Sequence, residues 1–481
     1  MSNLLSTLLS TAGALDAYTQ VLNVTQTNVA NANTPGYAKQ TQTLQALPFD
    51  PSMGSTGGVR AGDVQSSRDR FAEQAVRQQT TLLGQAQQNV TSFTSLQALF
   101  DISGNSGLPA ALNTLFQSFS AWGQSPNSTV ARQTVIQNAT AVADAFQQTG
   151  TGLATMAQDT TQQLQQAVTQ INQMAGQLAG YNKQILNGDR NDAGLDAQIN
   201  STLEQLSQYV NFTATPQSDG SMTVLINGQT PLVIGDQTYG ILPQAVPPDP
   251  ATAAYPGGPP HQSIVSYDGT DITAGITGGQ LASLLNLTNN VLPSYMGDAN
   301  NPGDLNAMAK QFADCVNNLL TSGNVSDGPP PVAGVPLFTY DTNNDTDVAM
   351  TLSVDPTVTS DQLAAITPGP PEVSNGVPLA LSQLSNPHDS TYEINGASYT
   401  EFYGSMATRV GNLLNDANNE LQVQQSAVAQ AQNVRQQLSG VSLDEEAAIL
   451  LQFQQGYEAN SKLITVLQQL SEDTINMLTT T

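Results

Sequence analysis

Apolar residues recur every seven positions in the segments at both ends of the chain. The N-terminal repeat consists of Leu8, Leu15, Leu22 and Val29. The C-terminal repeat consists of Leu443, Leu450, Tyr457 and Ile464. A seven-residue spacing places such a set on one face of a helix, where it can pack against a partner helix. We therefore predict two terminal coiled-coil helices and take both sets as candidate assembly-interface residues.

Two kinds of partner fit this pattern. The terminal helices could pack on each other or on the body of the protein, as helices in ordinary bundles do. They could instead pack against helices of neighbouring molecules. Periodicity alone leaves both possibilities open.

A turn motif follows the first predicted helix. It consists of Asn33, Thr34, Pro35, Gly36 and Tyr37. Pro35 disfavours the helical conformation at Thr34, because the proline ring clashes with the preceding backbone. Gly36 accepts backbone angles that other residues resist. We therefore expect the helix to stop at this turn and the chain to reverse its direction.

The charge of the chain excludes several classes of partner. Its 481 residues include 12 Lys and Arg against 38 Asp and Glu, which gives a net charge of −26. So acidic a surface repels phosphate backbones and anionic lipids, and we expect neither nucleic acid nor a membrane as a partner. Charged residues make up only 10% of the chain, compared with about 25% in typical domains. A surface with few charges can be buried against neighbouring molecules at a low desolvation cost.

The sequence shows no recognisable targeting segment. Met1 is followed by neither a basic region nor a continuous apolar core, as a secretory signal would require. No apolar stretch reaches the roughly 18 residues of a membrane-spanning helix. Cys315 is the only cysteine, so an intrachain disulfide is impossible and a small buried side chain is expected there.

Few residues could carry chemistry. The two histidines, His261 and His388, lie in separate Pro-containing loops without a nucleophile motif. Residues 341–347 alternate oxygen ligands as calcium loops do, but Thr346 and Leu352 stand where such loops need Gly and Glu. We therefore predict a solvated acidic turn, no metal or cofactor, and no enzymatic activity. A secreted hydrolase that uses His261 or His388 is kept as an alternative.

Helical periodicity continues inside the chain, over residues 68–100, 129–187 and 402–438. Residues 38–62 are rich in Gly, Pro and Ser and predict a connecting loop. Helices from both halves of the sequence can form one bundle, closed by the return of the chain. The expected fold is α+β and multidomain, with an elongated helical stem built from N- and C-terminal helices and an inserted β-rich domain.

Short strands are predicted from residue 212 onward, because Asp219-Gly220 and Asn227-Gly228 favour hairpin turns. The expected organisation has seven parts. The boundaries are 1–62 for the N-terminal helix and loop, 63–210 for the first half of the stem, 211–278 for the β-rich domain, 279–320 for a helical return segment, 321–376 for an insertion of loops and strands, 377–440 for the second half of the stem, and 441–481 for the C-terminal helix.

Three segments resemble the axial proteins of the bacterial flagellum, the family of rod, hook and hook-associated proteins. Residues 23–37, NVTQTNVANANTPGY, are similar to the N-terminal motif of that family. Residues 439–464 and 278–295 are similar to segments of its hook-associated members. Two departures occur: Ala38-Lys39 replaces the frequent Ser-Arg, and Ser66 stands where the family has Arg. We therefore expect a local contact made by that arginine to be missing.

The resemblance implies a structural subunit of the junction between hook and filament. It implies an extracellular location in the flagellum, with export through the type III channel and no cleaved signal peptide. The implied partners are further copies of the chain in a tubular ring, the hook protein, a second junction protein and a cytoplasmic export chaperone. The terminal helices would become ordered as they pack between subunits. Another axial protein, hook or distal rod, is the nearest alternative, and a secreted adhesin is a more distant one.

Overall fold

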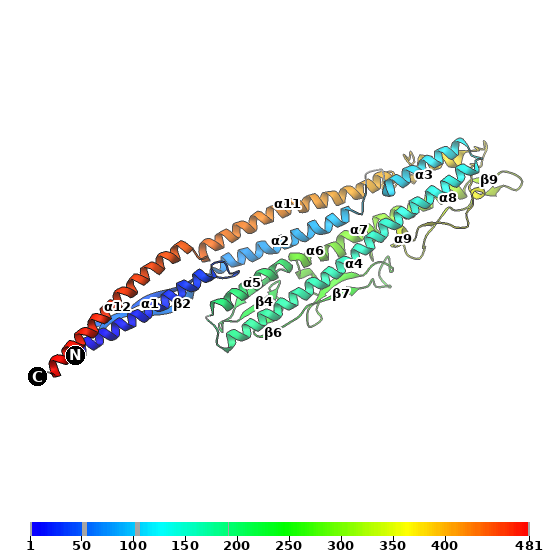
Figure 1. Cartoon of the computed structure of the whole chain (residues 1–481). Coiled ribbons are helices and arrows are strands. Elements are labelled where there is room, and N and C mark those ends of the chain that lie inside the picture. The colour runs from blue at the N-terminus through cyan, green and yellow to red at the C-terminus, as the bar shows by residue number, and fades with distance from the viewer. Residues whose placement is uncertain (1, 51–54, 102–105, 191, 480–481) are drawn as a thin grey trace.

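The chain forms an elongated, mainly helical molecule with both termini at the same end (Figure 1). The computed structural model describes residues 2–50, 55–101, 106–190 and 192–479. Within these residues, no helix is both long and apolar enough to cross a membrane.

The centre of the stem is a pair of helices from opposite halves of the sequence, α2 (Arg70–Gln97) and α11 (Tyr399–Ser439), which lie side by side (Figure 1). Asp69 caps α2 by accepting a hydrogen bond from the Ala72 amide at 2.8 Å. Ser398 and Glu401 form a capping box at the start of α11. The prediction that both halves of the chain build one bundle is confirmed.

The longest helix is α4 (Thr129–Asn187), whose bounds are those expected from the sequence. Its 59 residues correspond to a length of about 90 Å at 1.5 Å per residue. The helix runs without interruption through Gly150, Gly152, Gly176 and Gly180. At Gly150 and Gly152, added Cβ atoms would lie 2.8 Å from Met350 and 2.9 Å from Leu99. Glycine therefore allows close packing at these two positions.

Two hydrophobic cores lie along α4. The first joins its N-terminal half to α3 (Gly107–Gln124), α8 (Asp304–Thr321), α10 (Gly376–Gln383) and α11. The second joins its C-terminal half to α5 (Ala193–Tyr209), α6 (Gly279–Asn286) and the β-rich domain. Helix α3 was not foreseen, although Leu108, Leu112, Leu115 and Phe119 are all buried along one face of it.

The β-rich domain lies against the C-terminal half of α4 (Figure 1). Its four-stranded antiparallel sheet consists of β3 (Phe212–Pro216), β4 (Met222–Ile226), β5 (Thr230–Ile234) and β6 (Gln237–Thr238). A separate hairpin consists of β7 (Leu242–Val246) and β8 (His261–Val265). Asn227 and Gly228 have φ angles of 49° and 69° in the turn after β4, as the predicted hairpin requires.

The remaining segments are short. A π-helical stretch, Leu287–Val291, links α6 to α7 (Leu292–Met296). The insertion after α8 contains four short strands and a short helix: β9 (Asn324–Ser326), β10 (Val332–Ala333), β11 (Phe338–Thr339), α9 (Val348–Thr351) and β12 (Ser353–Val354). The insertion expected at 321–376 therefore consists of loops with a few strands.

The prediction of a connecting loop at residues 38–62 is wrong. This region forms a long antiparallel hairpin of β1 (Gln40–Asp50) and β2 (Ser55–Ser66). An isolated two-stranded hairpin is marginally stable in water, and this one rests on α1 (Ser2–Asn31). The hydroxyl of Ser10 donates to the carbonyl of Gly57 at 3.0 Å. The support comes from a separate element, so local composition did not reveal the strands.

Candidate functional site

The end of the molecule that holds both termini is built from α1, the hairpin β1–β2 and α12 (Leu443–Thr479), and we call it the terminal unit (Figure 1). Helix α1 leads from its end into the molecule and α12 leads back. The rings of Tyr18 and Phe453 meet between the two helices with centroids 5.7 Å apart. At Gly456, an added Cβ would lie 3.3 Å from the Tyr18 ring. The chain therefore pairs its own two ends.

The buried face of α1 differs from the predicted seven-residue repeat. It consists of Thr11, Ala14, Ala17, Val21, Thr25 and Asn28. The predicted Leu8, Leu15 and Leu22 lie at the margin of this face and are half-buried. Val29 is exposed. The four predicted residues of α1 thus remain partly accessible at the edge of the helix pair.

On α12, most apolar side chains are exposed. Among the predicted residues, Leu443 and Tyr457 are exposed, and Leu450 and Ile464 are half-buried. Three further leucine and valine residues, Leu463, Val466 and Leu470, are 44%, 54% and 49% exposed. Their spacing of three and four places them on one face of the helix. The seven-residue repeat predicted for this helix does not include these three residues, which form a second apolar stripe.

The predicted turn after α1 is confirmed, because the helix ends at Asn31. The amide of Thr34 donates to the carbonyl of Asn31 at 2.9 Å, and that of Tyr37 donates to the carbonyl of Thr34 at 3.1 Å. Asn33 and Pro35 are exposed. Gly36 has a φ of +75°, and an added Cβ would collide with the carbonyl oxygen of Ala197 in α5. The turn thus also docks the terminal unit on the stem.

Asn28 uses both polar atoms of its side chain at the base of α1, where it is 1% exposed. Its Nδ2 donates to the carbonyl of Gln40 at 2.8 Å and to Oε2 of Glu446 at 3.1 Å. Its Oδ1 accepts from the Tyr37 hydroxyl at 2.9 Å and from the Gln40 amide at 2.9 Å. One side chain therefore connects α1, its turn, β1 and α12.

The carboxylate of Glu446 lies beside Asn28, and Glu446 is also 1% exposed. The ammonium of Lys39 lies 3.2 Å from Glu446 Oε1 and 2.9 Å from Glu445 Oε2. Burial lowers the pKa of Lys39, but bonding to Glu445 and Glu446 outweighs it and the net shift is upward. Burial, and then the charge of Glu446, raise the pKa of Tyr37 to about 12. We call Asn28, Tyr37, Lys39, Gln40 and Glu446 the polar joint.

A cluster of charges continues from the polar joint into the stem. Arg68 donates to Asp196 at 2.7 and 2.9 Å, to Glu73 at 2.5 Å and to the carbonyl of Gly36 at 2.6 Å. Arg435 pairs with Glu204 at 2.6 Å and with Glu73 at 3.3 Å. The position at which the family has an arginine is Ser66. The missing contact expected there stays a prediction, and the contacts described above are made by Arg68, two residues further on.

Two hydrogen bonds from backbone amides to Ser439 fasten the same region where the chain enters and leaves the stem. The amide of Lys39 donates to the carbonyl of Ser439 at 2.9 Å. The amide of Asp69 donates to the Ser439 hydroxyl at 2.9 Å. Ser439 ends α11, four residues before α12 begins at Leu443. The terminal unit is thus joined to the stem by polar contacts at both crossings of the chain.

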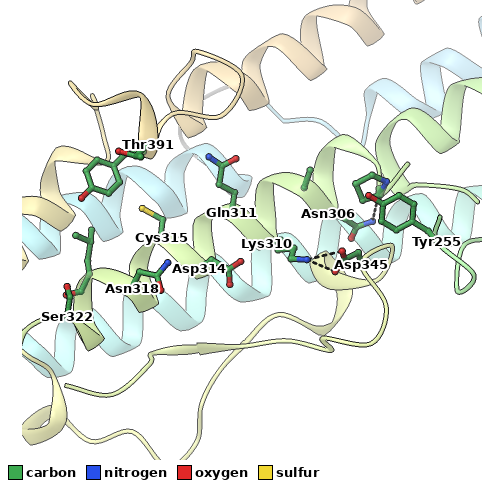
Figure 2. Close-up of a pocket in the computed structure, with 14 residues that line it drawn as sticks. Tyr255, Asn306, Lys310, Gln311, Asp314, Cys315, Asn318, Ser322, Asp345 and Thr391 are labelled. Carbon is green, nitrogen blue, oxygen red and sulfur yellow. Dashed lines mark hydrogen bonds and ion pairs between the residues drawn. The ribbon is translucent and has the colours of Figure 1, made fainter. Parts of the chain in front are cut away.

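Outside the terminal unit, a groove follows α8, and Figure 2 shows its lining residues. Cys315 lies in this groove, and burial, which outweighs a hydrogen bond to Tyr399, raises the pKa of its thiol to about 11. The thiol is therefore protonated at neutral pH and is no activated nucleophile. Neither His261 nor His388 lines the groove. The expectation of a small buried Cys315 is confirmed.

The acidic turn at 341–347 borders this groove. Lys310 holds the carboxylate of Asp345 at 2.7 and 2.8 Å (Figure 2). Asp341 accepts from the amide of Asn343 at 2.9 Å. Among the described residues, no three His, Cys, Asp or Glu side chains are grouped so that they could hold a metal ion. Asp345 and Asp341 are thus engaged with the protein itself, whereas the buried Oδ1 of Asp347 has no hydrogen-bond partner among the described residues.

Two protein-family models match the chain. Residues 93–338 match the helical domain of flagellar hook-associated protein FlgK. Residues 435–477 match the C-terminal model of the flagellar basal body rod proteins FlgEFG. The first match covers α3 to α8 and the second covers the end of α11 and nearly all of α12.

Individual relatives agree with these matches. The chain is 25% identical to flagellar hook-associated protein 1 of Bacillus subtilis, over 96% of each chain. It is 23% identical to the protein of the same name in Escherichia coli, over 99% of this chain and 100% of the other. The solved structure of the flagellar hook junction protein FlgK from Burkholderia pseudomallei is similar in fold, with a TM-score of 0.62 at 17% identity. That comparison covers 76% of this chain and 99% of the other.

Proposed function

The chain belongs to the family of flagellar hook-associated protein FlgK, a structural subunit of the hook–filament junction, and we propose that it assembles there by packing of its terminal units. The proposal rests on one observation, the accessible apolar edges of a helix pair that is already formed within a single chain. Leu8, Leu15 and Leu22 give one edge, and Leu443, Leu450, Tyr457 and Ile464 give the other.

The energetics favour such packing. Full burial of one leucine-sized side chain contributes about 1.5–3 kcal/mol, and several partly exposed ones occur on each helix. The helices are paired in the single chain, so association need not order each of them separately. The conformational entropy lost on assembly is correspondingly smaller.

We propose further partners because the chain belongs to this family and because much of the surface of α12 is exposed. They are other copies in a tubular ring, the hook protein, the second junction protein, and a cytoplasmic chaperone that covers α12 before export. Export through the type III channel without a cleaved signal and the absence of enzymatic activity belong to the same proposal. The protonated Cys315 thiol and the separate positions of His261 and His388 support a role without catalysis.

A hook or distal rod protein is the second candidate. The match of residues 435–477 to the rod-protein model favours it, because that segment is shared by several axial proteins. Labelling of isolated flagella separates the two candidates. A label confined to the boundary of hook and filament supports the junction role, and a label along the hook or in the rod contradicts it.

Removal of residues 443–481 tests assembly through the terminal unit. We expect non-motile cells that release unpolymerised filament protein into the medium. The matched control replaces exposed Val130, at the far end of the molecule, by Ser. Normal swimming of cells that carry only the truncated chain would contradict the proposal.

A further inference from the structure

A small apolar groove opens at the end of the terminal unit, between the start of α1 and the last part of α12 (Figure 1). Its volume is about 190 Å³, and we call it the tip groove. The lining residues are Leu4, Leu5, Leu8, Leu467, Ser471 and Thr474. Leu5 is 60% exposed. Four leucines thus surround a hollow that the single chain leaves open to solvent.

The size and lining of the tip groove suit one aromatic ring. A protein cavity of about 150 Å³ with apolar walls stays dry and binds benzene, and the tip groove is slightly larger. The Thr474 hydroxyl donates to the carbonyl of Leu470 at 2.7 Å, so it requires no partner from an occupant. A phenyl ring can therefore fill the groove without leaving this hydroxyl unpaired.

The hairpin β1–β2 carries a phenylalanine that matches this groove. The structure describes all twelve phenylalanines of the chain, and only Phe49 and Phe71 are exposed. Phe49 lies near the end of β1 and is 73% exposed. On the neighbouring strand, a Cβ added to Gly57 would lie 3.2 Å from the Phe49 Cβ and 3.4 Å from its ring. Strand β2 therefore supports the ring from one side, and little conformational entropy is lost when the ring enters a pocket.

The hairpin and the tip groove lie on opposite faces of α1. Ser10 meets the hairpin through its hydrogen bond to the carbonyl of Gly57, whereas Leu8 lines the groove. Residues two positions apart in an α-helix point about 200° apart. Phe49 thus lies on the far side of α1 from the groove of its own chain. A contact between two different faces is heterologous, and its repetition generates a ring or a helix of subunits.

The lack of charge at both surfaces favours a second copy as the partner. Each copy carries a net charge of −26, so copies repel one another and come together most easily where no charge has to be desolvated. None of the described residues that line the tip groove is charged. In residues 2–31, which form α1, the only charged residue is Asp16.

We propose that Phe49 of one copy inserts into the tip groove of the neighbouring copy. Insertion removes from water both the ring of Phe49 and the exposed side chain of Leu5. Leu467 of the groove is four positions from Leu463 and three from Leu470, so the groove continues the second apolar stripe of α12. This inference rests on the proposed assembly through terminal units and identifies one contact within it.

A photoreactive phenylalanine analogue at position 49 shows which surface this side chain meets. In isolated flagella that contain the full chain, we expect a crosslinked dimer of this chain. Position 49 should be attached to a peptide that includes residues 4–8 or 467–474. The same analogue at position 71, the other exposed phenylalanine, is the control and should not attach to those peptides. Attachment of position 49 to a different protein or to another part of the second copy overturns the proposal, and so does the absence of a crosslink.

Two substitutions test whether the contact contributes to assembly. Phe49→Ser removes the ring, and Ser471→Phe fills the groove. The controls are Phe71→Ser and Gln469→Phe, because Gln469 is exposed and points about 200° away from Leu467 on α12. Burial of one aromatic ring changes an association constant about tenfold or more, so both test variants should release at least about fivefold more filament protein into the medium than the unchanged chain, with each control within about twofold.

Denaturant unfolding of the four purified variants separates a lost contact from a lost fold. The altered side chains are exposed or half-buried, so we expect the midpoint of unfolding to stay close to that of the unchanged chain. A large loss of stability in Phe49→Ser would show that the ring supports its own hairpin, which contradicts the proposal.

The results also separate this contact from assembly as a whole. If removal of residues 443–481 stops swimming but Phe49→Ser and Ser471→Phe behave like their controls, the contact proposal fails and assembly through the terminal unit stands. If cells that carry only the truncated chain swim normally, the proposed assembly fails and this contact fails with it.

Discussion

The side chain of Asn28 in α1 donates a hydrogen bond of 3.1 Å to the carboxylate of Glu446 in α12, although 418 positions separate the two residues. Both side chains are buried, and Asn28 makes three further hydrogen bonds to Tyr37 and Gln40. The contact therefore fixes how the two ends of the chain lie relative to each other.

Replacing Asn28 by Ala should loosen the terminal unit. The change leaves the Tyr37 hydroxyl, the Gln40 amide and the Glu446 carboxylate each short of a partner, and an unsatisfied buried group costs about 1–3 kcal/mol. We expect the free energy of local opening of α1 and α12 to fall by about 3 kcal/mol, measured by native-state hydrogen exchange. Asn23→Ala, at an exposed position of the same helix, should change it by less than about 0.5 kcal/mol. Equal exchange in both variants would contradict the role of Asn28.

Alkaline pH should weaken the same region through Tyr37. Its pKa is raised from 10.0 to about 12 by burial and by Glu446, so the folded state favours the protonated phenol. The resulting stability is complete below the unfolded pKa of about 10 and is lost as the pH rises through the folded pKa of about 12.

Absorbance titration of tyrosinate checks this pH dependence. Relative to the unchanged chain, Tyr37→Phe should remove one phenol that titrates near pH 12. Glu446→Gln should move that phenol toward lower pH but not to its ordinary value, because burial is the larger cause of the shift. A difference spectrum centred at the ordinary pKa of about 10 would show that the Tyr37 hydroxyl is not held in the joint.

Gly36 and Gly13 should respond in opposite ways to alanine. Gly36 has a φ of +75° and packs against the backbone of α5, so Gly36→Ala should lower the stability by about 1–3 kcal/mol or more. Gly13 lies in α1 with nothing within 4 Å of an added Cβ, and Gly13→Ala should raise it by about 0.5–1 kcal/mol. Denaturant unfolding, followed by a probe in the terminal unit, measures both. The same sign for both variants would contradict this account of the turn.

Arg68 should matter more to stability than an exposed cation does. Arg68→Ala leaves the buried carboxylate of Glu73 with only the longer contact of 3.3 Å to Arg435, and loss of one partner from a buried pair costs about 3–5 kcal/mol. We expect a loss near the lower end of that range in denaturant unfolding, because Asp196 is partly exposed. Lys310→Ala breaks a more exposed pair with Asp345 and should cost at most about 1 kcal/mol. Similar losses in the two variants would argue against a buried role for Arg68.

Sequence patterns predicted the parts of the fold that depend on local periodicity. The bounds of α4 and the turn at Asn227-Gly228 follow from spacing and from backbone preferences. The hairpin β1–β2 was missed because its support comes from α1. Helix α3 was not predicted, although the regular spacing of its apolar residues is a local signal for a helix.

The candidate site was predicted only in part, for the same physical reason. The seven-residue repeats located the two helices, but the choice of buried face depends on what each helix meets. In α1 that face includes Thr11, Thr25 and Asn28, which no apolar pattern contains. The link from Asn28 to Glu446 joins opposite ends of the sequence. The contact of Arg68 with the carbonyl of Gly36 joins residues 32 positions apart, which no local pattern reveals.

The second apolar stripe of α12 gives the sharpest test of assembly through the terminal unit. Leu463, Val466 and Leu470 are about half exposed, so their joint replacement by Ser removes little buried surface from the single chain. We expect the free energy of unfolding to fall by less than about 1 kcal/mol. In a complex that buries the stripe, the lost apolar contacts amount to several kcal/mol, so association should weaken at least about a hundredfold. Sedimentation velocity measures the association and denaturant unfolding measures the stability. The control is Val130→Ser, at an exposed valine of α4 in the distant part of the molecule. Unchanged association of the triple variant would show that this face of α12 stays in solvent, whereas a large loss of stability would show that the stripe supports the single chain itself.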